Sequence, residues 1–229
     1  MATYFLSNLR FLREKFISGG FGTERLQELI DGKAIFPTEL IQLATICGET
    51  PTRLLQHNLQ EQGAAADGIK MVVFDVDGVL TEAGMYYTES GDEFKRFNAR
   101  DGIAMKALRK AGYQTAIISH GINEKLIRRR AELLDIPFVY CGKEPKSDVL
   151  ARWCAELHIG FEQCAFIGDD INDLSLFNVC GFTACPADAT EAVKEISDVL
   201  LDTRGGEGCV REWIDRFFFK SPLGAQFNI

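Results

Sequence analysis

The pattern of apolar and polar positions divides this chain into two parts. In residues 70–229, short apolar runs alternate with segments of helical periodicity, which is typical of an α/β fold with a doubly wound parallel sheet. We expect strands at 71–75, 114–119, 138–141, 164–168, 181–185 and 198–200, and helices at 103–111, 123–134, 147–157, 173–178, 190–196 and 208–218. Residues 84–97 carry two aromatic-rich alternating runs around Glu-Ser-Gly-Asp, which predicts a β-hairpin insertion.

Residues 1–62 have a different pattern. Their apolar residues recur at helical spacing, as in Leu6, Leu9, Leu12 and Phe16, which predicts a small all-helical domain. The stretch 63–69 is rich in small residues and has no periodic pattern, so it is interpreted as a linker. We therefore expect a helical domain at 1–62, a linker at 63–69 and an α/β domain at 70–229.

The composition indicates the cellular compartment and argues against some kinds of partner. The seven cysteines form no Cys-x-x-Cys pair and lie mostly inside apolar runs, so we expect buried, reduced thiols in a cytoplasmic protein. No apolar stretch approaches the roughly 20 residues that span a bilayer, and the charged residues within 1–16 argue against a signal peptide. The net charge of −8 argues against a nucleic-acid partner for the whole molecule.

Two motifs bring carboxylates to the ends of predicted strands. Residues 74–81 read Phe-Asp-Val-Asp-Gly-Val-Leu-Thr, and residues 166–173 read Phe-Ile-Gly-Asp-Asp-Ile-Asn-Asp. Both follow apolar runs that predict buried parallel strands, and ligands bind outside the carboxyl ends of such strands. Carboxylates converging there would repel one another unless a cation lay among them. The pattern therefore predicts a hard divalent ion, namely Mg²⁺.

The first motif also provides the groups for phosphoryl chemistry. Asp75 could attack phosphorus as a nucleophile, and Asp77, two residues on and on the same side of the chain, could act as the general acid and base. The alternative is that Asp77 and Gly78 only form a tight turn.

These two motifs resemble the first and last signature motifs of the haloacid dehalogenase superfamily of phosphotransferases. The resemblance implies a Rossmann-like core in which Asp75 is the nucleophile and a magnesium ligand. It implies that Asp77 is the acid/base and binds the metal through its backbone carbonyl. Asp169 matches the acidic metal ligand of the last motif, and Asp170 and Asp173 match its supporting acidic positions.

The two intermediate motifs of that superfamily are a Ser or Thr that ends a strand and a Lys that begins a helix. Ser119 fits the first and would hold phosphate oxygens. Lys143 and Lys146 are both candidates for the second. Lys146 is preferred because it directly precedes the predicted helix 147–157, and its ammonium would neutralise Asp75 and the phosphoryl group.

The spacing between the motifs indicates which group within the superfamily this chain resembles. The hairpin and one helix fill the gap between Thr81 and Ser119, so no large cap domain fits there. Together with the segments 84–87, 93–102 and 204–212, the α/β part resembles the capless sugar-acid phosphatases. These act on 3-deoxy-D-manno-octulosonate 8-phosphate or on 9-phosphates of nine-carbon sialic-type acids, in lipopolysaccharide or sialic acid biosynthesis. The resemblance implies a homotetramer in which a neighbouring subunit closes each site.

Substrate recognition is less well specified. Arg130 aligns with a family arginine that a neighbouring subunit presents to the sugar-acid carboxylate; otherwise it belongs to a solvated helix face with Arg128 and Arg129. Where relatives have Thr-Gly-Arg or Thr-Gly-Glu, this chain has Ser119-His120-Gly121. His120 either replaces the lost polar contact or is a loop residue, and eight- and nine-carbon substrates both remain open.

The helical part resembles a Cro/C1-type helix-turn-helix domain, although residues 13–32 look too short for both helices of the reading motif. Residues 1–66 contain six Lys or Arg and seven Asp or Glu, a net charge of −1, whereas a DNA reader carries a basic face. We therefore expect a packing or regulatory appendage. The competing hypotheses are a DNA-binding regulator whose phosphatase-like domain senses a sugar phosphate, and a broad phosphatase without a dedicated sugar acid.

Overall fold

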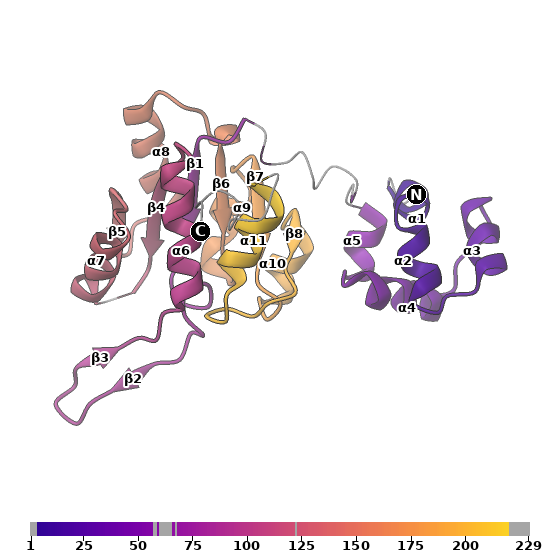
Figure 1. Ribbon diagram of the computed structural model, residues 1–229, viewed down its shortest axis with the longest axis horizontal. Coiled ribbons are helices and arrows are strands. Elements are labelled where there is room, and N and C mark those ends of the chain that lie inside the picture. The colour runs from indigo at the N-terminus through magenta and orange to yellow at the C-terminus, as the bar shows by residue number, and fades with distance from the viewer. Residues whose placement is uncertain (1–3, 57–58, 60–65, 67, 122, 220–229) are drawn as a thin grey trace, which may run out of the picture. The chain divides into compact units, whose positions relative to one another are not determined.

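The computed structural model describes residues 4–56, 59, 66, 68–121 and 123–219. The chain forms two compact units, Met1–Gly63 and Ala64–Ile229, and each is described by itself (Figure 1).

The larger unit is built on a six-stranded parallel sheet. Its strands, in the order in which they lie in the sheet, are β5 (Phe138–Cys141), β4 (Gln114–Ser119), β1 (Met71–Phe74), β6 (Cys164–Ile167), β7 (Phe182–Cys185) and β8 (Val199–Leu200). In the centre, Phe74 pairs with Ile117 of β4 on one side and with Ile167 of β6 on the other. The predicted doubly wound α/β fold is confirmed.

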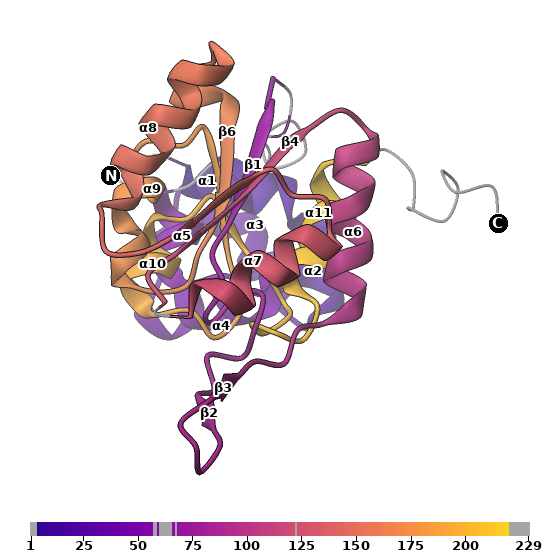
Figure 2. The ribbon, with the colours of Figure 1, turned by 90° about the vertical axis from the view of Figure 1, so that its left-hand side faces the viewer.

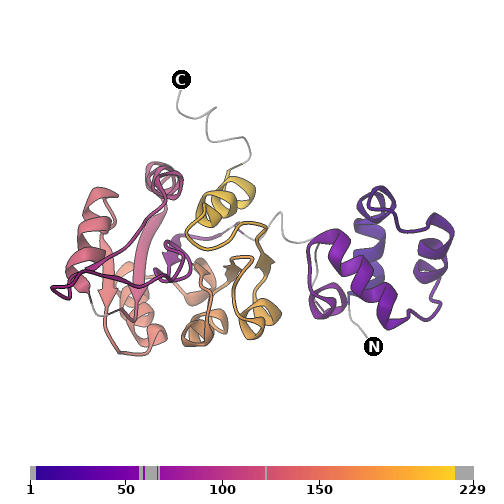
Figure 3. The ribbon, with the colours of Figure 1, turned by 90° about the horizontal axis from the view of Figure 1, so that it is seen from below.

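Helices cover both faces of this sheet, which explains why the strands are continuous apolar runs. The helices α6 (Ala99–Lys110), α7 (Glu124–Leu133) and α11 (Cys209–Phe217) pack on one face, and α8 (Lys146–Leu157), α9 (Leu174–Phe177) and α10 (Glu191–Ile196) pack on the other. In β1, Val72 and Phe74 face the first layer, whereas Met71 and Val73 face the second. Figure 2 shows β1, β4 and β6 between the two layers, and Figure 3 shows α11 in yellow on its side of the sheet.

The predicted hairpin consists of β2 (Tyr86–Tyr87) and β3 (Glu93–Phe94) and projects from the body of the unit (Figure 1). Its strands are held together by the cross-strand pair of Tyr86 and Phe94, whose rings stack with centroids 5.2 Å apart. Gly91, with φ +87°, supplies the left-handed turn residue. Two short 3₁₀ helices, η2 (Phe161–Gln163) and η3 (Ile171–Asp173), flank β6.

The smaller unit is all-helical in its described part. It contains α1 (Phe5–Phe11), α2 (Arg13–Ser18), α3 (Thr23–Ile30), α4 (Pro37–Cys47) and α5 (Pro51–Gln56) around their own apolar core. The sequence predicts that residues 13–32 are too short for both helices of a DNA-reading motif, and the structure has two short helices there, of six and eight residues. Both α2 and α3 lie there, because Gly20, with φ +90°, allows a turn of four residues between them.

Candidate active site

Two loops meet at the carboxyl ends of β1 and β6. Asp75 directly follows β1, and Asp169 lies two residues beyond the end of β6. Gly78 brings these loops into contact. A Cβ built on Gly78 would lie 2.0 Å from Asp169 Oδ2, and its φ of +88° is strained for any other residue. The Asp77–Gly78 turn therefore needs glycine for both its backbone conformation and its closeness to the second motif.

A buried lysine lies between two of the carboxylates. Lys146, the first residue of α8, donates from Nζ to Asp75 Oδ1 at 2.7 Å and to Asp173 Oδ1. All three residues are at most 3% exposed, so a net charge here is only weakly screened by water. Lys143, the alternative candidate, is exposed.

The carboxylates carry more charge than this lysine balances. Asp75, Asp169 and Asp173 each offer an oxygen within 4.8 Å of the others'. Burial, and then repulsion by Asp75, Asp173 and Asp170, raises the pKa of Asp169 to about 8. Burial and the Asp173 charge also raise the pKa of Asp75, although Lys146 opposes this. Such an all-oxygen, electron-rich set fits a hard divalent cation.

Asp173 is already bound to the protein through both oxygens. Besides the Lys146 bond, its Oδ2 accepts the backbone N–H of Asp169 at 2.9 Å. Asp75 and Asp169 thus fit a cation better than Asp173 does, and Asp173 fits the supporting position expected for it. Asp170 caps η3 by accepting the N–H of Ile171 and is exposed.

A cavity of about 360 Å³ opens over these groups. The β4 end contributes Ser119, which is 1% exposed and accepts the N–H of Gly121 at 2.9 Å. His120 also lines the cavity, and its Nε2 lies 3.0 Å from the carbonyl oxygen of Glu144. Gly121 lines the cavity from the same segment, and the remaining lining residues come from the two acidic loops and the hairpin: Asp75, Asp77, Ala83, Met85, Tyr87, Glu93, Lys95, Asp169, Asp170 and Asn172.

The glycine-rich segment before α11 packs against the Asp77–Gly78 turn. A Cβ on Gly205 would lie only 1.9 Å from the carbonyl oxygen of Gly78. Gly206 donates its N–H to the carbonyl of Val79 at 2.9 Å, and Gly205 donates to Asp188 Oδ1, also at 2.9 Å. This segment therefore packs against the Asp77–Gly78 turn and supports its position.

Comparisons with known proteins agree with this geometry. A family model for haloacid dehalogenase-like hydrolases matches residues 99–181. The 3-deoxy-D-manno-octulosonate 8-phosphate phosphatase KdsC of Haemophilus influenzae is 39% identical over 149 residues, which are 65% of this chain and 82% of that protein. The chain belongs to the haloacid dehalogenase-like hydrolases.

Two solved structures extend the match to three dimensions. A phosphatase of the same name from Moraxella catarrhalis, in complex with magnesium, phosphate and KDO, superposes with a TM-score of 0.67 at 32% identity, covering 69% of this chain and 90% of that one. A probable YrbI family phosphatase from Pseudomonas syringae gives 0.70 at 38% identity, covering 74% and 96%. The comparisons lend no support to the Cro/C1 resemblance of the N-terminal unit.

This member of the hydrolase family brings most of the predicted site residues together, with one exception. Asp75, Asp77, Asp169, Ser119 and His120 line one cavity, and Lys146 lies beneath it. Arg130, on α7, is not among the described residues that line it. Arg130 instead donates to the carbonyl of Asn98 at 3.1 Å and lies over the Phe97 ring.

Lys95 is a cavity residue that sequence reasoning missed. Its Nζ lies 2.5 Å from Asp77 Oδ1, although 18 positions separate the two residues. In the sequence, Lys95 is a lysine at the end of a hairpin strand, between two positions that are exposed in the structure. A lysine in such a place ordinarily has a solvated side chain, so nothing marked it as a cavity residue.

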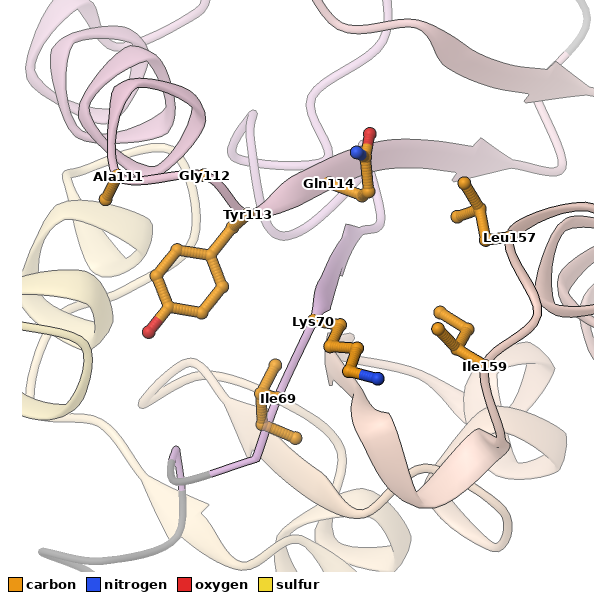
Figure 4. A pocket seen from close by; sticks show the side chains of 8 residues that line it. All are labelled: Ile69, Lys70, Ala111, Gly112, Tyr113, Gln114, Leu157 and Ile159. Atoms are coloured by element: carbon orange, nitrogen blue, oxygen red, sulfur yellow. The ribbon is translucent and has the colours of Figure 1, made fainter.

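A second cavity, of about 400 Å³, lies at the opposite, amino ends of the strands (Figure 4). Its lining is mainly apolar or neutral: Ile69, Lys70, Ala111, Gly112, Tyr113, Gln114, Leu157 and Ile159. Within the part of the chain that the structure describes, none of the helices has the length and apolar character needed to cross a bilayer.

Proposed function

We propose that this protein is a magnesium-dependent phosphatase of a 2-keto-3-deoxy sugar acid, of the 3-deoxy-D-manno-octulosonate 8-phosphate type. One observation carries the proposal. The buried triad of Lys146, Asp75 and Asp173 lies beside Asp169 under a cavity, in a chain 39% identical to a phosphatase of that substrate. The nine-carbon 9-phosphates remain the alternative substrates, because Ser119-His120-Gly121 carries no acidic or guanidinium side chain.

The reaction proceeds in two displacements. A carboxylate oxygen of Asp75 attacks phosphorus, the bond to the sugar oxygen breaks, and Asp77 gives a proton to that oxygen. Water then attacks the aspartyl-phosphate, Asp77 takes its proton, and phosphate leaves with Asp75 restored. Ser119 Oγ holds a phosphoryl oxygen at the end of β4, and the Lys146 ammonium offsets the negative charge that gathers on Asp75 and the phosphoryl group.

Asp75, Asp169 and the backbone carbonyl of Asp77 would hold Mg²⁺, with Asp170 and Asp173 in support. Bound there, the ion would neutralise carboxylate and phosphoryl charge and so let phosphate approach Asp75. The raised pKa of Asp169 supports this assignment, because a second positive charge is what these carboxylates lack.

The hairpin supports assembly into a homotetramer in which a neighbour closes each cavity. Met85, Tyr87 and Phe94 are each more than half exposed, which is costly for large apolar side chains unless another surface covers them. In such an assembly, Arg130 would bind the carboxylate of the substrate held by the neighbouring subunit, because Arg130 lies away from the cavity of its own chain. Light scattering of the full chain measures the mass of the assembly.

The cysteines and the helical unit fit a cytoplasmic enzyme with an appendage. All seven cysteines are free thiols, as expected in a reducing compartment. In the helical unit, the cations of α3 and the following loop are paired with acids: Arg25 with Glu28 and Glu39, and Lys33 with Glu28. This pairing supports a packing or regulatory role for the unit, without nucleic acid.

A substrate panel tests the proposal. The full-length protein is assayed with Mg²⁺ on the eight-carbon 8-phosphate, nine-carbon 9-phosphates, glucose 6-phosphate and p-nitrophenyl phosphate. We expect kcat/KM for one sugar-acid phosphate to exceed that for glucose 6-phosphate by about 100-fold, because a site that pairs with a carboxylate rejects esters lacking it. Equal values across the panel would indicate a broad phosphatase instead.

A further inference from the structure

Lys95 is a buried cation at the base of an exposed hairpin. It follows β3 directly, yet its side chain is only 3% exposed, because it turns back into the cavity over the carboxyl end of β1. Two carboxylates hold its Nζ there: Asp77 Oδ1 at 2.5 Å and Glu93 Oε1 at 2.8 Å. The hairpin is thereby tied to the catalytic turn by an ion pair as well as by the chain.

The contact distinguishes the two oxygens of Asp77. Oδ1 lies against Lys95, and Thr81 Oγ1 is 3.4 Å from the same atom. Oδ2 lies on the side of Gly121, 3.6 Å from the position that a Cβ on that glycine would take, where Ser119 Oγ is also close. Fixing one oxygen of a planar carboxyl group fixes the other, so Oδ2 is directed towards the place where Ser119 would hold the phosphoryl group.

The charge and anchoring of Lys95 suit this task. Burial lowers the pKa of its amine, but hydrogen bonds to Asp77 and Glu93 outweigh burial and raise the pKa above its ordinary value. The amine is therefore charged at neutral pH. Because Glu93 holds it from the hairpin side, Lys95 acts on Asp77 as a fixed support and not as a mobile cation that follows the substrate.

We propose that Lys95 is a positioning residue for Asp77, holding Oδ1 so that Oδ2 is the atom that transfers the proton. This inference rests on the proposed phosphatase function. In the first displacement, the bond from phosphorus to the leaving oxygen breaks as the Asp75–phosphorus bond forms, and the proton on Asp77 Oδ2 passes to the leaving oxygen. The contribution of Lys95 is then largest for an ester whose leaving oxygen needs that proton.

The test compares two esters across four proteins. Wild type, Lys95→Met, Lys95→Arg and Arg96→Gln are assayed as full chains with Mg²⁺, on the eight-carbon 8-phosphate and on p-nitrophenyl phosphate. The first has an alkoxide leaving group that needs a proton, whereas nitrophenolate leaves as a stable anion. Arg96 is the matched control, because it neighbours Lys95 but is 67% exposed and contacts Glu82 instead.

For Lys95→Met we expect kcat/KM on the sugar-acid ester to fall by about 100-fold, with less than about threefold loss on p-nitrophenyl phosphate and little change in KM. Lys95→Arg should recover part of the loss, and Arg96→Gln should stay within about twofold of wild type. An equal loss on both esters, or a raised KM with unchanged kcat, would overturn the positioning role. Failure of the wild type to cleave either ester would instead overturn the proposed function itself.

A crystal structure of Lys95→Met provides a readout besides activity. We expect the Asp77 carboxyl group to leave its wild-type orientation or to adopt two, while the β1 backbone is unchanged. An Asp77 side chain in the wild-type orientation in that variant would contradict the proposal even if activity had fallen.

Discussion

The two edges of the same sheet carry cavities of similar size and different electrostatics. At the carboxyl edge, Asp75, Lys146 and Asp173 are buried together beneath about 360 Å³ of space. At the amino edge, a cavity of about 400 Å³ has one charged lining residue, Lys70, which is exposed. Buried charge is costly, so it persists where chemistry requires it. The position of unbalanced buried charge, and not cavity volume, identifies the active edge.

Replacing Asp75, the proposed nucleophile, should have the largest effect. In Asp75→Asn the amide cannot form the aspartyl-phosphate, so we expect kcat to fall by about 10³-fold or more, measured as phosphate release. The melting temperature should stay equal or rise, because the substitution removes a buried charge that Asp173 repels. Near-normal activity in this variant would remove the basis of the distinction between the two edges.

Removing the buried cation should cost both activity and stability. Lys146→Met leaves Asp75 and Asp173 without their shared partner. We expect kcat to fall by about 10²-fold and the free energy of unfolding to fall by about 3 kcal/mol, measured by denaturant titration. Lys70→Met at the amino edge and Lys143→Met on the exposed loop are the matched controls, each expected within about 0.5 kcal/mol of wild type. If Lys143→Met were the inactive variant, the lysine assignment would be reversed.

The sequence predicted the centre of the sheet because β1 and β6 are buried on both faces, so each is an apolar run that stops where an acidic motif begins. The ends of the strands carry a weaker signal in the sequence than their apolar centres. Asp198 was placed in the last strand, but it precedes β8 and instead accepts the N–H and hydroxyl of Thr183. The start of α6 was also missed by four residues, although Asn98 caps it by accepting the N–H of Arg100.

The acidic motifs were visible because their residues are close in sequence. The Lys95–Asp77 pair was not, since only the folding of the hairpin onto the turn brings the two together. The same holds for Gly205, whose contact with Gly78 joins the last segment of the domain to the first motif. Contacts between distant segments leave no periodic or local signal, and these are the contacts that complete the cavity.

Two glycine substitutions should separate strain from function. In Gly205→Ala, the new Cβ would press on the Gly78 carbonyl and displace the turn that carries Asp77, so we expect kcat to fall about tenfold and the free energy of unfolding to fall by about 2 kcal/mol. Gly112, at the amino edge, has φ +96° with open space around it. Gly112→Ala should therefore lower the free energy of unfolding by about 1 kcal/mol through backbone strain alone and leave kcat unchanged. Loss of activity in Gly112→Ala would mean that the two edges are coupled.

Metal binding should give the smallest and most specific effect, a pH-dependent stabilisation. The folded-state pKa of Asp169, about 8, lies above its ordinary value of 3.8. Between these values the metal-free folded chain keeps a proton that the unfolded chain has released, so the contribution of this group to stability falls as pH rises through that window. Mg²⁺ would displace this proton, and its binding therefore strengthens with pH up to about 8.

The measurement is the increase in melting temperature caused by Mg²⁺ at pH values between 5.5 and 8.5, with NaCl at equal ionic strength as the control. We expect a small increase at the acidic end and a rise of several degrees near pH 8. Asp169→Asn should remove most of this pH dependence, because the group that exchanges the proton is gone. A stabilisation by Mg²⁺ that is constant across the range would mean that the ion binds without displacing a proton. In that case, the raised pKa of Asp169 would not distinguish the carboxyl edge from the amino edge.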